Sequence, residues 1–295
     1  MAQLFRIAGI SKQAFHQGLD RELKRKDEQM QLLPIIQEIR RDHPRLGCRE
    51  MYYMIRPSYM GRDQFERFCY IHGFKVTVNK RFYRTTDSLG VTRFPNLFLE
   101  TEKITQINQV WVSDITYYQI RDQVYYITLI MDLFSRRIVG WNASDSLRTD
   151  ETTLKALSMA IKNRCISLNS NLIFHSDGGG QYFSKEFRKL TDHYGIRNSM
   201  CESVYENPHA ERINGTIKNA YLIPYGPRDF SELKTMLEKA ILLYNTKKPH
   251  QSLDRCTPVD FERLISSGLL TKTWIINKRQ MMSKKEKVNI CITSN

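Results

Sequence analysis

The spacing of hydrophobic residues predicts a helical first third of the chain. Ser11 is a good N-cap that follows a turn at Gly9, so residues 2–15 have the pattern of a short helix-turn-helix or of an ordinary helix hairpin. Pro34 is expected to kink or restart the charged helical segment that follows. Helical segments are expected at 2–8, 11–15 and 20–42, and within 43–57 and 61–76.

From residue 111 the pattern changes to strands. Residues 111–120, 124–134 and 136–144 are strand-like and separated by tight turns, which predicts an antiparallel meander. Helices and short strands are then expected to alternate at 149–163 (helix), 172–176 (strand), 184–194 (helix), 196–199 (strand), from Pro208 (helix), 230–245 (helix) and 258–265 (helix). The order βββαβαβα predicts an α/β fold, a mixed sheet covered by helices.

Composition and pattern together divide the chain into five parts. We expect a helix-turn-helix and helical segment (1–42), a second small helical unit (43–88), a linker (89–107), a core of strands and helices (108–268) and a basic C-terminal tail (269–295).

The net charge of +14 is concentrated outside the predicted sheet region. Residues 1–100 carry 18 Lys or Arg against 11 Asp or Glu, residues 101–214 carry 13 of each, and residues 215–295 carry 14 against 7. A neutral centre between two basic flanks suits a protein that holds a polyanion such as double-stranded DNA at its ends and reacts with it in the middle. Charge alone leaves nucleic-acid binding and an ordinary basic protein about equally favoured.

Membrane insertion and zinc binding are both disfavoured by the sequence. No apolar run approaches the ~18 residues that a membrane span needs, and the first residues lack a signal-peptide pattern. The six cysteines and seven histidines are scattered, without a zinc-binding spacing. We therefore expect a cytoplasmic protein with reduced thiols.

Two basic stretches in the first third are candidates for DNA contact. The second helix of the helix-turn-helix pattern would present Lys12 and Gln13. Farther on, basic residues alternate with aromatic ones, as in a strand or wing that lies against a phosphate backbone; a solvated strand fits this pattern almost equally well. The basic residues of this stretch are Lys80, Arg81 and Arg84.

Three acids occupy positions that suit catalysis. Asp114 lies in the first strand, Asp177 follows the strand 172–176, and Glu211 is in the first turns of the helix that begins near Pro208. In a βββαβαβα sheet the two strands are neighbours, so these carboxylates can meet at one edge. Converging carboxylates select Mg²⁺ or Mn²⁺, and two such ions promote in-line phosphoryl displacement. Asp132, at another strand end, is interpreted as structural, pairing with Arg136 or Arg137 or capping a turn.

Residues 108–265 resemble the catalytic core of DDE transposases and retroviral-type integrases, which has an RNase H-like fold. The matching strings are W-x-x-D-I-T (111–116), D-L-F-S-R-x-I-V-G-W (132–141), H-S-D-x-G-x-Q-Y (175–182), G-I-R-x-S-M (195–200), N-x-x-x-E (207–211), and Y-N-x-x-x-P-H-Q-S-L (244–253) with Thr257-Pro258. The first third is similar to the second-frame protein of two-frame bacterial insertion sequences, through the H-P-R-x-G-x-R segment at 43–49.

This resemblance implies metal-dependent DNA strand cleavage and strand transfer, with no covalent protein–DNA intermediate. It assigns the metals, two ions of Mg²⁺ or Mn²⁺, to Asp114, Asp177 and Glu211, and a phosphate contact near the scissile bond to Lys218. It also implies element ends and target DNA as substrates, a homo-oligomer on DNA, a partner or fused segment from an upstream reading frame, and a bacterial, nucleoid-associated location. Further DNA contacts or supporting roles are expected for His175, Gln181, Asn207, Asn214, Arg45 and Arg49.

Two departures from the family pattern stand out. The stretch 178–210 between Asp177 and Glu211 is slightly shorter than is usual, and Gly178 and Gly180 replace bulkier residues. The histidine/cysteine zinc domain of retroviral integrases is absent from the sequence, which favours the bacterial transposase. A DNA-binding regulator with an inactive core is disfavoured because all three acids are present. An RNase H-type nuclease is disfavoured because it needs no basic flanks.

Overall fold

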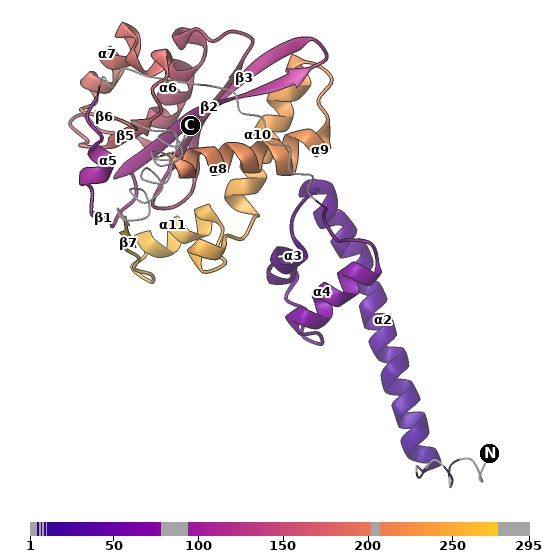
Figure 1. The fold of residues 1–295 in the computed structure, drawn as a ribbon. Coiled ribbons are helices and arrows are strands. Elements are labelled where there is room, and N and C mark those ends of the chain that lie inside the picture. The colour runs from indigo at the N-terminus through magenta and orange to yellow at the C-terminus, as the bar shows by residue number, and fades with distance from the viewer. Residues whose placement is uncertain are drawn as a thin grey trace, which may run out of the picture.

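Five strands form the central sheet of the protein, seen here in a computed structural model that describes residues 5, 7, 9, 11–77, 94–201 and 207–276 (Figure 1). Their order across the sheet is β4-β3-β2-β5-β6. The first three are β2 (Val110–Ile120), β3 (Gln123–Asp132) and β4 (Ile138–Ser144), which pair antiparallel as the predicted meander. β5 (Ile173–Ser176) and β6 (Arg197–Met200) join in parallel. The predicted RNase H-like α/β fold class is confirmed.

Helices cover both faces of this sheet. Successive side chains of a strand point to opposite faces, so the buried residues of each strand pack against helices on both sides. Trp111 and Phe174 face a cluster that includes residues of α6 (Thr153–Arg164) and α7 (Lys185–His193). Val110 and Val112 face the opposite cluster, which includes residues of α8 (Pro208–Thr216), α10 (Phe230–Thr246) and α11 (Pro258–Ser266). At Gly140 of β4 the backbone of α6 approaches so closely that a Cβ atom would clash with the Ala156 carbonyl.

The helix that begins at Pro208 changes its winding partway along. α8 continues without a break into a π-helical segment, η4 (Ile217–Leu222), and then into α9 (Ile223–Tyr225), which ends at Gly226. Such π segments are frequent at functional sites, because they shift the faces that a helix presents. The remaining short elements are α5 (Leu97–Glu100), η1 (Thr149–Glu151), η2 (Gly180–Phe183) and η5 (Gln251–Leu253).

Residues 11–77 form a helical arm that projects from the core (Figure 1). The arm contains α2 (Lys12–Asp42), α3 (Cys48–Ile55) and α4 (Arg62–Ile71), packed around a small cluster that includes Ile36 and Phe65. Ser11 caps α2 as predicted, since its side chain accepts a hydrogen bond from the backbone of Ala14.

The predicted end of this helix at Phe15 was wrong. Of the two outcomes expected at Pro34, a kink or a restart, the restart does not occur, because α2 runs as one helix of 31 residues. Burial of Leu32 and Ile36 against α3 and α4 outweighs the backbone hydrogen bond that a proline removes.

A two-stranded sheet that the sequence did not predict joins distant segments. β1 (Lys103–Ile104) pairs with β7 (Trp274–Ile275), and the Trp274 indole N–H donates to the Phe134 carbonyl at 3.0 Å. The first residues of the expected basic tail therefore pack on the core, while residues 277–295 lie outside the described residues. In the described part of the chain, no helix has both the length and the hydropathy to span a bilayer.

Candidate active site

The register of the sheet places the two aspartates side by side. β2 and β5 are parallel neighbours with Val112 opposite His175. Asp114 and Asp177 each lie two residues farther along, so they reach the same level of adjacent strands, which are spaced by about 4.8 Å. Asp114 also shares its side of the sheet with Val112, the side that α8 covers. The predicted convergence of these two acids agrees with this register.

α8 carries a third acid, which is exposed, and an amide that reaches Asp114. Pro208 occupies the first turn of the helix, where its missing N–H costs nothing. Glu211 and Asn214, one turn apart, share a face of this helix. The Asn214 side-chain amide donates to Asp114 Oδ2 at 3.0 Å, which ties α8 to the middle of β2. Sequence reasoning expected a supporting role or a DNA contact from Asn214, and the structure shows it in contact with one of the three acids.

Burial and like charge dominate the electrostatics of the two aspartates. Burial raises the pKa of Asp114 to about 7, and the charges of Asp177 and, less strongly, Glu211 add to this shift. The hydrogen bond from Asn214 lowers the pKa and so opposes the shift. Burial also raises the pKa of Asp177, and the N–H of Gly179, which donates to Asp177 Oδ1 at 3.1 Å, opposes this shift. Proximity of like charges at a buried position is costly unless a cation offsets it.

The donor atoms fit a hard divalent cation. All three acids offer oxygen, and the buried Oδ1 atom of Asn214 has no hydrogen-bond partner among the described residues. If the Asn214 amide were flipped, its oxygen would face the Asp114 carboxylate and repel it. The orientation in which the Asn214 N–H groups face Asp114 is therefore the favourable one. Within the described residues, no three His, Cys, Asp or Glu side chains lie close enough together to hold an ion. Oxygen ligands of this kind match Mg²⁺ or Mn²⁺ and not zinc.

The other residues expected near the site have different surroundings. Asn207, at the start of α8, donates to the Ser113 carbonyl at 2.9 Å and so attaches this helix beside Asp114. The His175 imidazole is fully buried and bonds to Ser199 Oγ at 2.9 Å. The Lys218 ammonium lies 4.1 Å from the centre of the Tyr117 ring, and burial lowers its pKa. Gln181 is half-buried, two residues beyond Gly179.

A cation and an aromatic ring that sequence reasoning did not single out hold the start of α8. The Arg136 guanidinium donates to Nδ1 of His209 at 3.1 Å and stacks 5.0 Å from the Trp274 ring. Burial, with the charges of Arg136 and Arg212, lowers the pKa of His209 to about 3, so the imidazole stays neutral and accepts. His209 is two residues before Glu211, so this contact helps to position the catalytic helix.

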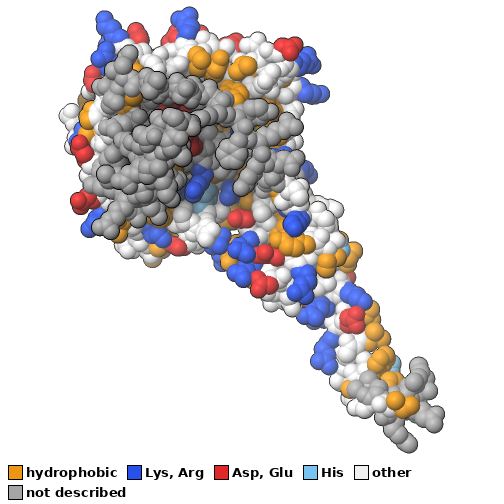
Figure 2. All heavy atoms as spheres, in the orientation of Figure 1, with side chains coloured by type: hydrophobic (Ala, Val, Ile, Leu, Met, Phe, Trp, Pro, Cys, Tyr) orange, Lys and Arg blue, Asp and Glu red, His pale blue; other side chains and the backbone are white. Residues whose placement is uncertain are grey.

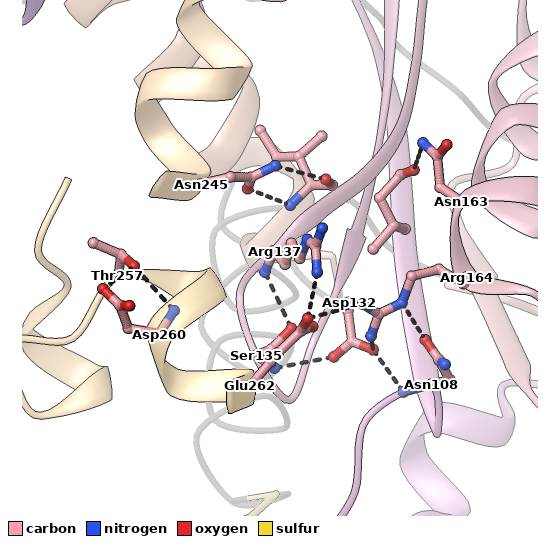
Figure 3. Close-up of polar contacts among 12 residues, drawn as sticks. Asn108, Asp132, Ser135, Arg137, Asn163, Arg164, Asn245, Thr257, Asp260 and Glu262 are labelled. Carbon is pink, nitrogen blue, oxygen red and sulfur yellow. Dashed lines mark hydrogen bonds and ion pairs between the residues drawn. The ribbon is translucent and has the colours of Figure 1, made fainter. Parts of the chain in front are cut away.

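Asp132 is structural, as predicted, and Figure 3 shows its surroundings. Its Oδ1 atom accepts the N–H groups of Phe134 and Ser135 at 2.9 and 3.0 Å, which caps the turn after β3. The ion partner is neither of the arginines that we expected. It is Arg164 of α6, at 3.8 Å, which also binds Glu262 of α11 at 2.9 Å.

The predicted DNA-binding residues that lie in the described part of the arm are not among the residues around Asp114. Lys12 and Gln13 are exposed at the start of α2. In the arm, Arg49 pairs with Glu66 at 3.0 Å, and Arg45 donates to the Asn219 carbonyl of η4 at 2.9 Å. Lys80, Arg81 and Arg84 lie outside the described residues.

The sequence is similar to those of known proteins. Two family models described as "Integrase core domain" match residues 105–205 and 195–258. The transposase for insertion sequence element IS904 of Lactococcus lactis is 31% identical over 172 residues, which are 57% of this chain and 67% of that protein. An uncharacterized 31 kDa protein of insertion element IS600 from Shigella sonnei is 28% identical over 270 residues, 88% of this chain and 97% of that protein.

Among solved structures, the chain is similar to the HTLV-2 integrase catalytic core domain in complex with magnesium. The identity is 25%, with a TM-score of 0.44, over 52% of this chain and 96% of that one. The sequence relatives and the domain matches decide the classification. The chain belongs to the insertion-sequence transposases with an integrase catalytic core, a family of polynucleotidyl transferases that act in DNA transposition.

Proposed function

We propose that this transposase cuts and joins DNA strands at a site formed by Asp114, Asp177 and Glu211, which hold two divalent ions, Mg²⁺ or Mn²⁺. The observation that carries the proposal is the buried Asp114 carboxylate, whose pKa is raised by burial and by the charges of Asp177 and, less strongly, Glu211. When bound, such ions supply Lewis-acid activation of an oxygen nucleophile and stabilise the leaving oxygen. Water is the nucleophile for cleavage of a phosphodiester, and the freed 3′-hydroxyl is the nucleophile for joining to a second duplex.

The chain's own residues orient this site. Asn214 holds one oxygen of Asp114 and leaves the other lone pairs of that carboxylate for a ligand. Gly179 fixes one oxygen of Asp177 in the same way. Lys218, two turns beyond Glu211, is proposed to leave the Tyr117 ring and bind a phosphate near the scissile bond, since a half-desolvated ammonium gains from an anion.

The two basic flanks are proposed to supply most of the affinity for duplex DNA, at the element ends and at the target. Within the arm, Lys12 and Gln13 at the exposed start of α2 are the proposed contacts. Because two ends and a target must be held together, we propose a homo-oligomer on DNA that acts with, or fused to, the product of an upstream reading frame. The site of action is then the bacterial nucleoid.

A strand-transfer assay with end-containing oligonucleotides tests the proposal. Glu211→Gln keeps the shape of the side chain and loses its charge, so cleavage and joining should disappear while DNA affinity stays within about threefold. Glu206→Gln is the matched control and should retain most activity. A dead Glu206 variant beside an active Glu211 variant would show that the site is misassigned.

Metal binding can be measured separately from activity. Titration of Mn²⁺ should raise the melting temperature of the wild type, because the ion binds the folded state only. Asp114→Asn should abolish that shift. Strand transfer at wild-type rate in excess EDTA, or an undiminished Mn²⁺ shift in the Asp114 variant, would refute the metal assignment.

A further inference from the structure

Two sequence strings that the catalytic site does not use meet where the arm joins the core. The H-P-R-x-G-x-R string (43–49) forms the turn between α2 and α3, and the Y-N-x-x-x-P-H-Q-S-L string (244–253) follows the end of α10. A cavity of about 160 Å³ lies between them. Its lining residues are His43, Arg45, Leu46, Gly47, Glu50, Ala220, Tyr221 and Lys248. This volume is well above the ~10–15 Å³ that one water needs.

Hydrogen bonds and one ion pair fix the two walls of this cavity. Nδ1 of His43 lies 2.9 Å from the hydroxyl of Tyr221. Near the cavity, the hydroxyl of Tyr225 donates to the Asp42 carbonyl at 2.7 Å, and Lys239 pairs with the Asp42 carboxylate at 3.1 Å. The cavity is therefore bounded by an ordered interface.

His43 is neutral in this setting. Burial lowers its pKa to about 4, the charges of Lys248 and Lys239 add to the shift, and Asp42 opposes it. A neutral imidazole offers one N–H and one acceptor. His43 therefore adds no charge to the cavity wall, and the charge there comes from other side chains.

The cations at the cavity exceed the acids. Arg45 and Lys248 line it against one acid, Glu50, and no described carboxylate forms an ion pair with either cation. Burial lowers the pKa of Lys248, Arg255 adds to the shift, and the charge of Glu50 only partly opposes it. Among the described residues no acceptor receives the hydrogen bonds of the Lys248 ammonium.

Arg255 places a further positive charge behind this wall. Its guanidinium stacks 4.2 Å from the ring of Tyr53 in the arm, and its buried Nη1 atom has no acceptor among the described residues. Arg255 also has a φ of 71°, a left-handed conformation that costs a non-glycine residue on the order of 1 kcal/mol. The backbone of Arg255 is thus held in a left-handed conformation, with its guanidinium at the interface between arm and core.

We propose that this cavity binds one backbone phosphate of the DNA substrate, with the Lys248 ammonium and the Arg45 guanidinium donating to its oxygens. The inference rests on the proposed function, which supplies DNA as the substrate. A phosphate brings the oxygen acceptors that the Lys248 ammonium lacks, and it can also accept from the N–H groups of Arg45 that do not bond to the Asn219 carbonyl. Figure 2 shows Lys and Arg side chains, with some Asp and Glu among them, on the arm near its junction with the core.

The neighbouring lysine provides a matched control. Lys247 is exposed, whereas Lys248 is half-buried, and each substitution by glutamine removes one positive charge from the same loop. DNA affinity of the full chain is measured by fluorescence anisotropy at several salt concentrations. Lys248→Gln should weaken binding about tenfold and lower the log–log salt slope by about 0.9, the value of one phosphate contact. Lys247→Gln should leave the slope unchanged.

Melting temperatures without DNA separate binding from a structural role. Because Lys248 is desolvated without an acceptor, Lys248→Gln should not lower the melting temperature. An unchanged salt slope for Lys248→Gln overturns the inference, whether or not the variant is destabilised. Inorganic phosphate is the second probe. If it raises the melting temperature of the wild type while the DNA slope of Lys248→Gln equals that of the wild type, the cavity takes free phosphate only, and the inference is again overturned.

Failure of the proposed function gives a different result. If the wild type shows no DNA binding at any salt concentration, the function itself fails. If the wild type binds DNA and the Lys248 and Lys247 variants have equal slopes, only the phosphate site fails.

Discussion

Arg164→Met should destabilise the core by about 3 kcal/mol, because it breaks a buried charge network. The Arg164 side chain is 9% exposed and binds Glu262 at 2.9 Å, Asp132 at 3.8 Å and the Asn108 side chain at 2.8 Å (Figure 3). Removing one partner of a buried pair typically costs about 3–5 kcal/mol, since it leaves a charge that is neither hydrated nor paired. Methionine keeps the length and apolar packing of the side chain, so the loss is mainly electrostatic.

The remaining contacts place the expected loss at the lower end of that range. Glu262 keeps Arg137 at 2.6 Å, and Asp132 keeps the N–H groups of the turn that it caps. Burial alone would raise the pKa of Glu262, but the hydrogen bonds and charges of the two arginines outweigh it and lower that pKa. About 3 kcal/mol corresponds to a fall of about 6–12 °C in melting temperature for a domain of this size.

Urea unfolding of the full chain, followed by circular dichroism, measures this loss. Arg263→Met is the matched control, because its side chain is 76% exposed and its pair with Asp260 at 2.9 Å should contribute at most about 1 kcal/mol. If the Arg164 and Arg263 variants lose equal stability, the network in Figure 3 does not stabilise the fold and the reasoning from burial is refuted.

Removing residues 1–84 should weaken DNA binding and flatten its salt dependence by about 0.9 in log–log slope per lost phosphate contact; an unchanged slope in anisotropy titrations would show that this region does not contact DNA. Lowering the pH from 6.5 to 4 should destabilise the protein by up to about 3 kcal/mol through His43, whose lowered pKa of about 4 means that only the unfolded chain takes up a proton in that window. The pH dependence of the urea midpoint should therefore be shallower in His43→Gln, and equal slopes would contradict the shift. Asn214→Ala should reduce strand transfer about 10–100-fold and raise the Mn²⁺ concentration needed, with DNA affinity unchanged, because Asp114 loses the donor that orients it; wild-type metal dependence would exclude this role.

The aspartates of the site could be predicted from the sequence because strand patterns carry register information. Asp114 lies within a long strand-like run and Asp177 directly after a short one, so the topology alone brings them together. The amide that holds Asp114 could not be assigned in the same way. Spacing puts Asn214 on the face of Glu211, but which partner it reaches depends on how α8 packs on β2.

Other features of the fold depend on contacts between residues far apart in the sequence, and a local sequence pattern cannot predict them. The continuity of α2 through Pro34 follows from burial against α3 and α4, a tertiary effect that outweighs a local propensity. β1 and β7 are two residues each, too short for any period, and they lie at opposite ends of the core sequence. The role of Arg164 was missed for the same reason, since its partners come from β3 and α11.

The π-helical turn of η4 explains how one helix can serve two sites. Before this turn, Asn214 of α8 donates to Asp114, and at its start Lys218 lies over the Tyr117 ring of β2. Three residues later Tyr221 bonds to His43 of the arm, and Asn219 between them accepts from Arg45. A π turn winds more residues per turn than an α-helix, so it offsets the face that follows it from the face before it. Glu211 and the residues that contact the arm are thus carried by one continuous helical run.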